Sequence, residues 1–221
     1  MVLMVHYVLV CAIKLHQGRS DEIWWLCHVT LALAAAGFLL NARTLVGMAF
    51  VGVLVPHTLW LGDAVLGSFS GLGCAGVRDY LDNADALTWL STCHHFYLIP
   101  LLWAALSRQP AKPRASLLGM AGLFVLISIV SRFLLPESAN INFAHGLFPA
   151  STKRLLITIN ALPAAAYLLV LDSLVIGLLF VPASLVLGWF VKSASTQSSP
   201  SPSLSASGGD GFLGAGTWPA G

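Results

Sequence analysis

Long apolar runs separated by polar links of different lengths make up most of the chain. Four runs, at residues 23–40, 44–62, 87–106 and 115–135, each approach or reach the roughly 20 apolar residues that a membrane-spanning helix needs. The link between the first two runs is so short that their helices must be antiparallel. The pattern predicts an all-α, polytopic integral membrane helical bundle over residues 1–192, with five or six spans.

The apolar stretch 155–191 allows two interpretations. As one continuous helix it would be about 55 Å long, which exceeds the ~30 Å hydrocarbon core. It could form two spans that turn at Asp172-Ser173, or one long helix that is tilted or broken near Pro163 or Pro182. Because a two-residue turn between spans is tight, we favour one tilted or broken helix.

The two ends of the chain differ from this pattern. Residues 1–13 are apolar but too few to span a bilayer. They are similar to the core of a signal peptide, yet they lack its basic start and a clean cleavage pattern, so we expect a retained helix that enters the membrane partly or packs against the bundle. Residues 193–221 are rich in Ser, Pro, Gly and Ala, which predicts a disordered tail.

Composition supports a membrane protein and excludes some partners. The chain is 57% hydrophobic and 9% charged, whereas a soluble domain is about 25% charged. A net charge of +2 without a Lys/Arg cluster gives no sign of nucleic-acid binding. The four cysteines form no CxxC pair, and Cys27 and Cys93 lie in predicted spans, so we expect buried thiols and not a disulfide framework.

Alternating helices place the links at two ends of the bundle. Links 14–22, 63–86 and 136–154 share one end, which we call the polar end, and links 41–43 and 107–114 share the other, the basic end. The densest short basic link is 107–114, which favours a cytoplasmic location for the basic end. The polar end would then face away from the cytoplasm.

Histidines fall at similar depths below the polar end. At 1.5 Å per residue, His28 and His57 each lie about 7 Å below this end, and His95 lies about 11 Å below it. Asp63 lies at the rim. Adjacent helical residues point about 100° apart, so we expect His95 to face the centre and His94 to face a neighbouring helix or the rim.

These histidines have a structural and a metal-binding interpretation. A single histidine in a membrane helix often forms only a hydrogen-bonded helix contact. Alternatively, His28, His57 and His95, with or without Asp63, could bind Zn or another transition metal. No HxxxH or HExxH motif places two ligands on one helix face, so we do not favour a metal site from the sequence.

A catalytic interpretation pairs a nucleophile with a histidine base. Cys27 or Thr30 on the first span could attack an ester, with His95 on the third span as the base. A nearby imidazolium would favour the reactive thiolate form of Cys27. An inert, buried thiol is the alternative.

Polar residues near the same end could bind a lipid head group. Arg132 offers a bidentate fork for a phosphate or carboxylate, and Asn140, Asn142 and His145 could add further contacts. Arg132 could also simply extend its side chain to the interface.

Four segments resemble an uncharacterised family of bacterial multi-pass membrane proteins. They are WLCHV at 25–29, PHTLW at 56–60, HFYLIPLLW at 95–103 and NINF at 140–143. That family has an Asn-Ile/Val-Asn-aromatic motif before its last helix, usually ending aromatic-aromatic-Gly, where this chain has FAHG. The resemblance implies a bacterial inner membrane location and no particular activity.

The chain also has a distant similarity to the androgen-induced lipid esterases and related intramembrane acyltransferases. Those proteins are six-span bundles with a Thr or Cys nucleophile on one helix and a His on another. Cys27 and His95 match these roles by type and order. The similarity implies an acyl-ester hydrolase or acyltransferase that acts on membrane lipid without a cofactor.

Two functional hypotheses follow. In the first, Cys27 attacks a lipid ester, His95 is the base, and His28, His57 and Asp63 orient or stabilise the reacting groups. In the second, the protein is not an enzyme, and its histidine cluster is structural or binds a metal.

Overall fold

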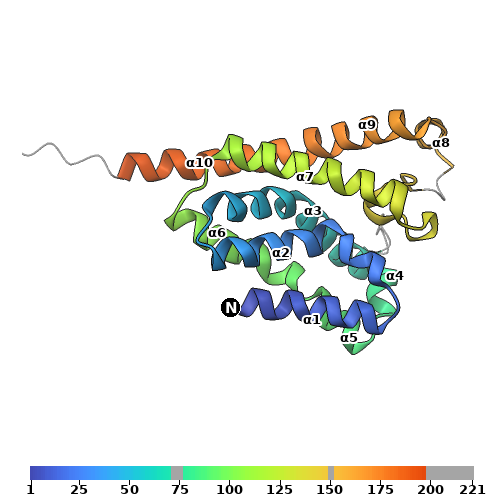
Figure 1. Ribbon diagram of the computed structural model, residues 1–221, viewed down its shortest axis with the longest axis horizontal. Helices are drawn as coiled ribbons and strands as arrows, with labels where there is room; N and C mark the ends of the chain where they lie inside the picture. Colours follow the sequence, from blue (N-terminus) through green and yellow to red (C-terminus); the bar gives the residue numbers. More distant parts are fainter. Residues whose placement is uncertain (71–76, 149–151, 198–221) are drawn as a thin grey trace, which may run out of the picture.

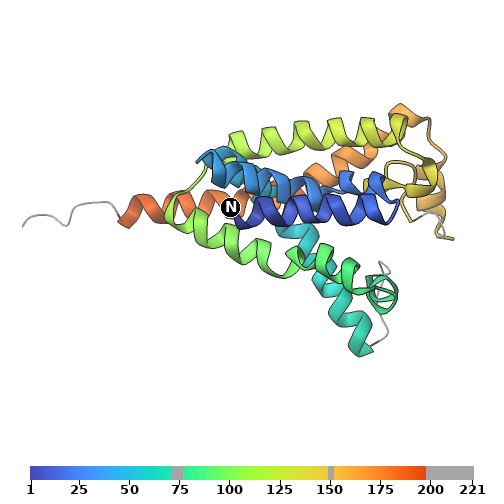
Figure 2. The ribbon, with the colours of Figure 1, turned by 60° about the horizontal axis from the view of Figure 1, so that its bottom comes forward.

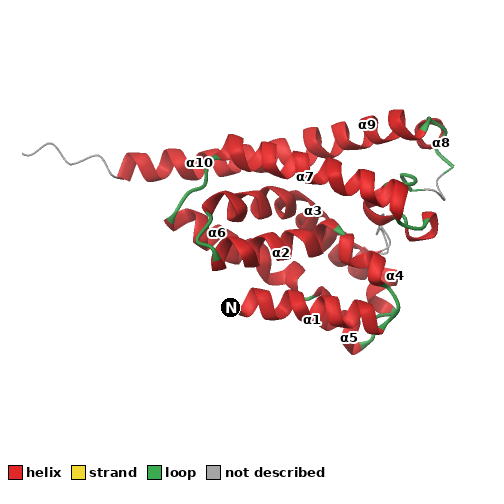
Figure 3. Cartoon of the chain, in the orientation of Figure 1, coloured by secondary structure: helices red, strands yellow, loops and turns green. Residues whose placement is uncertain are grey.

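A computed structural model describes residues 1–70, 77–148 and 152–197 (Figure 1). Within these ranges the secondary structure is helical, without a strand (Figure 3). Three helical segments are long and apolar enough to cross a membrane: Arg43–Gly67, Pro113–Leu134 and Ala164–Lys192. The predicted all-α fold is confirmed for the described residues, and these three segments indicate a membrane protein.

Most of the described chain lies in long or medium helices, joined by short helical turns. In chain order the elements are α1 (Val2–His16), the 3₁₀ turn η1 (Ser20–Trp24), α2 (Leu26–Leu39), α3 (Arg43–Ser70), α4 (Val77–Asp82), α5 (Ala86–Thr92), α6 (His94–Arg108), α7 (Pro113–Leu134), the 3₁₀ turns η2 (Glu137–Ala139) and η3 (Ile141–Phe143), α8 (Arg154–Asn160), α9 (Ala164–Val175), the π-helical segment η4 (Ile176–Phe180) and α10 (Val181–Gln197).

Helix α3 is the centre of the bundle, because it contacts α2, α6, α7 and α10. Figure 1 shows α7 with α9 and α10 on one side of it and α1 with α5 on the other. Figures 1 and 2 both show α1 running alongside α2. The buried core follows α3 and includes Phe50, Leu98, Leu102, Met120 and Phe180. The predicted antiparallel pairing of the first two apolar runs is confirmed by the packing of α2 against α3.

The links also lie at the predicted ends. The α2–α3 and α6–α7 links share the basic end, and η1, α4, η2 and η3 share the polar end (Figure 1). Asn41, in the α2–α3 link, has a positive φ of 52°, which asparagine adopts more readily than most residues. A left-handed residue lets the chain reverse direction within this short link.

The stretch 155–191 is one broken helix and not two spans. Helix α8 ends at Asn160, and α9 begins directly after Pro163, whose ring is incompatible with continuing the preceding helix. Asp172 lies inside α9, without a turn. The π-helical segment η4 ends just before Pro182, which lacks an N–H for the carbonyl four residues earlier.

The predicted run 87–106 is divided in two. Helix α5 ends at Thr92 and α6 begins at His94, so Cys93 marks a break. Asp85 caps α5 by accepting a hydrogen bond from the Thr88 amide at 2.7 Å. Hydrogen bonds from the Thr88 hydroxyl and amide lower the pKa of the Asp85 carboxyl.

The ends of the chain extend further as helix than we expected. Helix α1 reaches His16 and packs against α2 and α5, which agrees with the expected packing of residues 1–13 against the bundle. Helix α10 continues to Gln197, four residues beyond the predicted start of a disordered tail at Ser193. The rest of that predicted tail, residues 198–221, lies outside the described residues.

Helix α3 approaches two neighbouring helices closely at Gly52. A Cβ atom added there would lie 2.6 Å from Cγ2 of Thr30 on α2 and 2.9 Å from Sδ of Met120 on α7. Gly62, ten residues later on the same helix, has no such neighbour within 4 Å. Gly52 therefore sets the spacing between three helices.

We expect Gly52→Ala to destabilise the bundle, because the added methyl group overpacks the contact with Thr30 and Met120. The cost should be about 1–3 kcal/mol, measured as a lower thermal midpoint in detergent. Gly62→Ala is the matched control and should be neutral or stabilise by up to about 1 kcal/mol, since alanine favours the helix. Equal midpoints for the two variants would contradict the close approach.

Candidate metal centre

Five histidine rings from four helices form one cluster, which we call the imidazole cluster. His94 is at its centre and is fully buried. Its ring centroid lies 4.3 Å from that of His95 and 5.5–5.8 Å from those of His28, His57 and His6. The predicted convergence of His28, His57 and His95 is confirmed.

The central position of His94 differs from our expectation. On the assumption of a continuous helix, we expected His95 to face the centre and His94 to face a neighbouring helix or the rim; the His94 ring does lie beside His28 of α2, but at the centre of the cluster. The helix is instead interrupted at Cys93. Nδ1 of His94 lies 2.9 Å from the Ser91 carbonyl oxygen. Nδ1 of His95 lies 2.9 Å from the Thr92 carbonyl oxygen. Both rings therefore face the same side.

His95 lies between two aromatic rings at the edge of the cluster. Its ring stacks on Trp60 at 4.4 Å between centroids, with 26° between the planes. On its other side the His57 ring lies 4.3 Å away. Trp60 and His57 both belong to α3, so α3 and the start of α6 fix this ring together.

Backbone carbonyls define the tautomers of three cluster rings. Nδ1 of His28 lies 2.7 Å from the Glu22 carbonyl, and Nδ1 of His94 and of His95 have the carbonyl partners given above. A carbonyl oxygen only accepts, so each Nδ1 carries a proton. In a neutral ring, the lone pair is then on Nε2.

Several ring nitrogens are buried without a hydrogen-bond partner. Nε2 of His94 and both ring nitrogens of His57 have none among the described residues. His57 is 1% exposed and His94 is 0% exposed. A buried polar atom without a partner costs about 1–3 kcal/mol, so such atoms are rare and need a physical explanation.

The ring nitrogens are close enough to bind one metal ion. Donor atoms of His57, His94 and His95 all lie within 4.8 Å of one another, and so do donor atoms of Cys27, His28 and His94. In a tetrahedral zinc site with Zn–N of about 2.0–2.1 Å, two nitrogens lie about 3.4 Å apart. Each donor therefore needs to move by roughly 1 Å or less.

A buried ion pair supports the position of His28. Lys14, which is 1% exposed, lies 2.8 Å from the Glu22 carboxylate, and Arg19 pairs with the same side chain. These contacts hold η1 against the end of α1. They thereby fix the Glu22 carbonyl that accepts the hydrogen bond from His28.

Asn142 clamps the start of α2, next to the cluster. Its side-chain nitrogen donates to the Trp24 carbonyl, and its side-chain oxygen accepts from the Leu26 amide, both at 2.8 Å. It therefore caps α2 from a distant part of the chain, just before Cys27 and His28. Its φ of 53° is one that asparagine tolerates.

The other predicted head-group residues hold the same loop together. The Asn140 side chain accepts from the amides of His145 and Gly146, and Nε2 of His145 lies 3.1 Å from the Ser131 carbonyl. Arg132 donates to the Ala144 carbonyl at 3.3 Å. These contacts position the clamp, and head-group binding stays a prediction.

Asp63 lies apart from the donors described above. Its carboxylate accepts a hydrogen bond from the Val77 amide at 3.1 Å, at the start of α4. It belongs to neither group of donors that could hold a metal ion among the described residues.

The predicted catalytic residues fall into different donor groups. Cys27 shares its group with His28 and His94, whereas His95 shares its group with His57 and His94. Thr30, the other nucleophile considered, donates its hydroxyl to the Leu26 carbonyl at 2.8 Å. His94, not His95, is the ring of α6 that is grouped with the thiol.

Sequence reasoning missed His6 as a cluster residue. Its Nδ1 is hydrogen-bonded to the Tyr97 hydroxyl, and its Nε2 lies 3.1 Å from the Leu90 carbonyl. A histidine in an apolar run was the available signal. We did not use it because residues 1–13 are too few to form a span.

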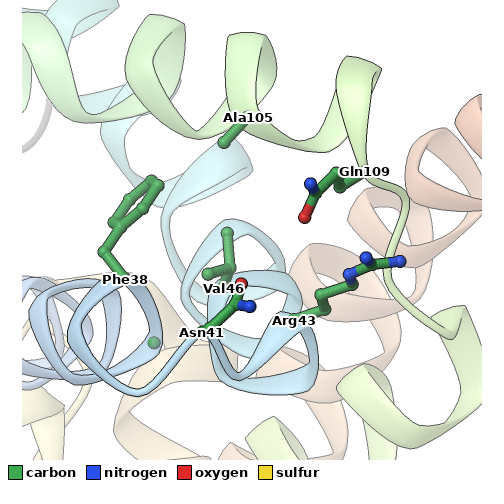
Figure 4. A pocket seen from close by; sticks show the side chains of 7 residues that line it. Phe38, Asn41, Arg43, Val46, Ala105 and Gln109 are labelled. Atoms are coloured by element: carbon green, nitrogen blue, oxygen red, sulfur yellow. The ribbon is translucent and has the colours of Figure 1, made fainter.

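A pocket lies at the basic end, between the α2–α3 link and the end of α6 (Figure 4). Its lining includes Asn41, Arg43 and Gln109, and no residue of the imidazole cluster.

Comparison of the chain with protein-family models, curated proteins and solved structures gave no match. The geometry described above therefore carries the functional argument.

We expect Asn142→Ala to destabilise the protein by about 1–2 kcal/mol, because α2 loses its cap. Asn142→Asp keeps the acceptor for Leu26 but loses the donor for Trp24, so its thermal midpoint should lie between those of wild type and Asn142→Ala. A wild-type midpoint for Asn142→Ala would contradict the clamp.

Proposed function

We propose that this chain is an integral membrane protein that binds a transition-metal ion through its imidazole cluster. His57, His94 and His95 are the donors, with His28 beside them. The single observation that carries the proposal is the set of buried ring nitrogens on His57 and His94 without a hydrogen-bond partner among the described residues. A bound metal ion would satisfy Nε2 of His94 and the one nitrogen of a neutral His57 ring that carries a lone pair.

The carbonyl groups that hydrogen-bond to the histidine rings favour metal binding over a purely structural role. Histidines that bind metals usually donate their other ring N–H to a carbonyl or carboxylate, which fixes the ring. His28, His94 and His95 each have such a carbonyl partner. Neutral imidazoles suit Zn, Cu, Fe or Ni, and not Ca or Mg, which prefer oxygen.

We also propose that five segments cross the membrane: α2, α3, α5 with α6, α7, and α9 with α10. The basic end faces the cytoplasm, as the Lys/Arg content of residues 107–114 favours. The imidazole cluster then lies towards the non-cytoplasmic face of a bacterial inner membrane. The cluster would be reached from the polar end.

Zinc is a suitable first probe of the cluster. The purified full chain should bind about one equivalent of Zn(II). His57→Ala or His94→Ala should weaken this binding by at least tenfold, because substituting even a residue that only supports a metal ligand lowers metal affinity about 10–100-fold. His16→Ala is the matched control, because His16 is an exposed histidine on α1. Its affinity should equal that of wild type.

Zinc binding that is unchanged in both His57→Ala and His94→Ala would overturn the proposal. Metal content is measured by elemental analysis after dialysis, and affinity by competition with a chelating dye. Thermal midpoints of each apo variant show whether the fold survives the substitution.

The orientation is tested by labelling single cysteines in intact cells. Gln109 is exposed at the basic end and Glu137 is exposed at the polar end. In a background with the native cysteines replaced, a membrane-impermeant maleimide should label Glu137→Cys and not Gln109→Cys. The reverse pattern would contradict the proposed orientation.

A second candidate function is acyl transfer or acyl-ester hydrolysis on membrane lipid. The observation that favours it is the proximity of the Cys27 thiol to ring nitrogens of His28 and His94. The imidazole would take the thiol proton, the sulfur would form a thioester, and the lipid alcohol would leave with that proton. Water or a second alcohol would then release the acyl group and restore the thiol.

The two candidates differ in their response to substitution and chelation. For acyl chemistry, Cys27→Ala should abolish the turnover of a fluorescent acyl lipid, and a chelator should have no effect. Turnover that persists in Cys27→Ala would exclude the thiol mechanism.

A further inference from the structure

Cys27 lies at the side of the imidazole cluster that faces α2. It occupies the first turn of α2, directly before His28. Its Sγ atom and a ring nitrogen each of His28 and His94 lie within 4.8 Å of one another. A sulfur donor therefore lies beside His28 and His94 of the cluster.

His94 belongs to both donor groups. Its Nδ1 is bound to the Ser91 carbonyl, so Nε2 is the nitrogen that can bind an ion in either group. This Nε2 is fully buried and has no hydrogen-bond partner among the described residues. One unpartnered nitrogen thus faces two alternative sets of donors.

The two sets differ in chemical softness. His57, His94 and His95 supply only imidazole nitrogen, which suits Zn(II) and other divalent ions. The set with Cys27 adds sulfur, a soft donor that suits Cu(I) and that also binds Zn(II). A metal–sulfur bond of about 2.3 Å and a metal–nitrogen bond of about 2.0 Å place sulfur and nitrogen about 3.5 Å apart in a tetrahedral site.

We propose that Cys27, His28 and His94 form a second position, for monovalent copper, which shares His94 with the all-imidazole position. This inference rests on the metal-binding function proposed above. On binding, the S–H bond breaks, a Cu–S bond forms, and the thiol proton passes to water. Copper stays monovalent, so the step needs no oxidant or reductant.

The buried contacts of the start of α2 fit this role. Asn142 clamps the backbone on both sides of Trp25, and the Glu22 carbonyl orients His28. A rigid helix start keeps the thiol and the His28 ring at a fixed separation. The position formed by Cys27, His28 and His94 is therefore preorganised. Little conformational entropy is lost when the ion binds.

The test compares Cu(I) and Zn(II) affinities of the purified full chain under anaerobic conditions, by competition with a Cu(I)-specific chromogenic chelator and a zinc dye. We expect Cys27→Ala to lower the Cu(I) affinity by at least tenfold and to leave the Zn(II) affinity within about threefold of wild type. Cys11→Ala, which removes a free thiol from α1, is the matched control and should change neither affinity.

The zinc measurement separates this inference from the proposed function. Equal Cu(I) affinity in wild type and Cys27→Ala, with zinc binding intact, would overturn the copper position alone. An equal loss of Cu(I) and Zn(II) affinity in Cys27→Ala would mean one combined site and would also overturn it. A wild-type chain that binds neither ion would overturn the proposed function itself. Retained zinc binding in Cys27→Ala also shows that the variant folds.

Discussion

A ring nitrogen buried without a partner is costly, and the packing around α3 and α6 concentrates several of them at one place. At a surface bulk water satisfies such atoms, whereas inside an apolar bundle a buried group, an ordered water or an ion has to do so. His57 contributes two such nitrogens and His94 contributes one. An ion that accepts the lone pair of His94 Nε2 and the single lone pair of a neutral His57 ring would offset part of this cost, which is the basis of the proposed metal binding.

The arrangement also depends on groups outside the membrane-spanning segments. The Lys14–Glu22 ion pair fixes η1, and Asn142 fixes the first turn of α2. Each connects a segment of the polar end to the helix that carries Cys27 and His28. The Asn-Ile-Asn-Phe motif is therefore a structural clamp on the cluster, which gives a physical reason for two asparagines in backbone conformations that few other residues adopt.

The position of each histidine along its apolar run predicted which end of the bundle holds the cluster, because the rise of a helix is fixed and successive helices alternate in direction. It could not predict the central ring, since the direction of His94 depends on a break at Cys93 that apolar periodicity does not reveal. The role of Asn142 depends on a contact across more than one hundred residues. Such contacts come from tertiary packing and not from local pattern. For the stretch 155–191, Pro163 was one of two prolines at which the sequence predicted a break, and the helix is interrupted there.

The central claim is that imidazole rings bind an ion inside the bundle. X-ray absorption spectroscopy of the zinc-loaded wild-type protein tests it most directly. The account predicts a first shell dominated by nitrogen at about 2.0–2.1 Å, with the outer-shell scattering that imidazole rings produce. A first shell of oxygen atoms without imidazole scattering would contradict it.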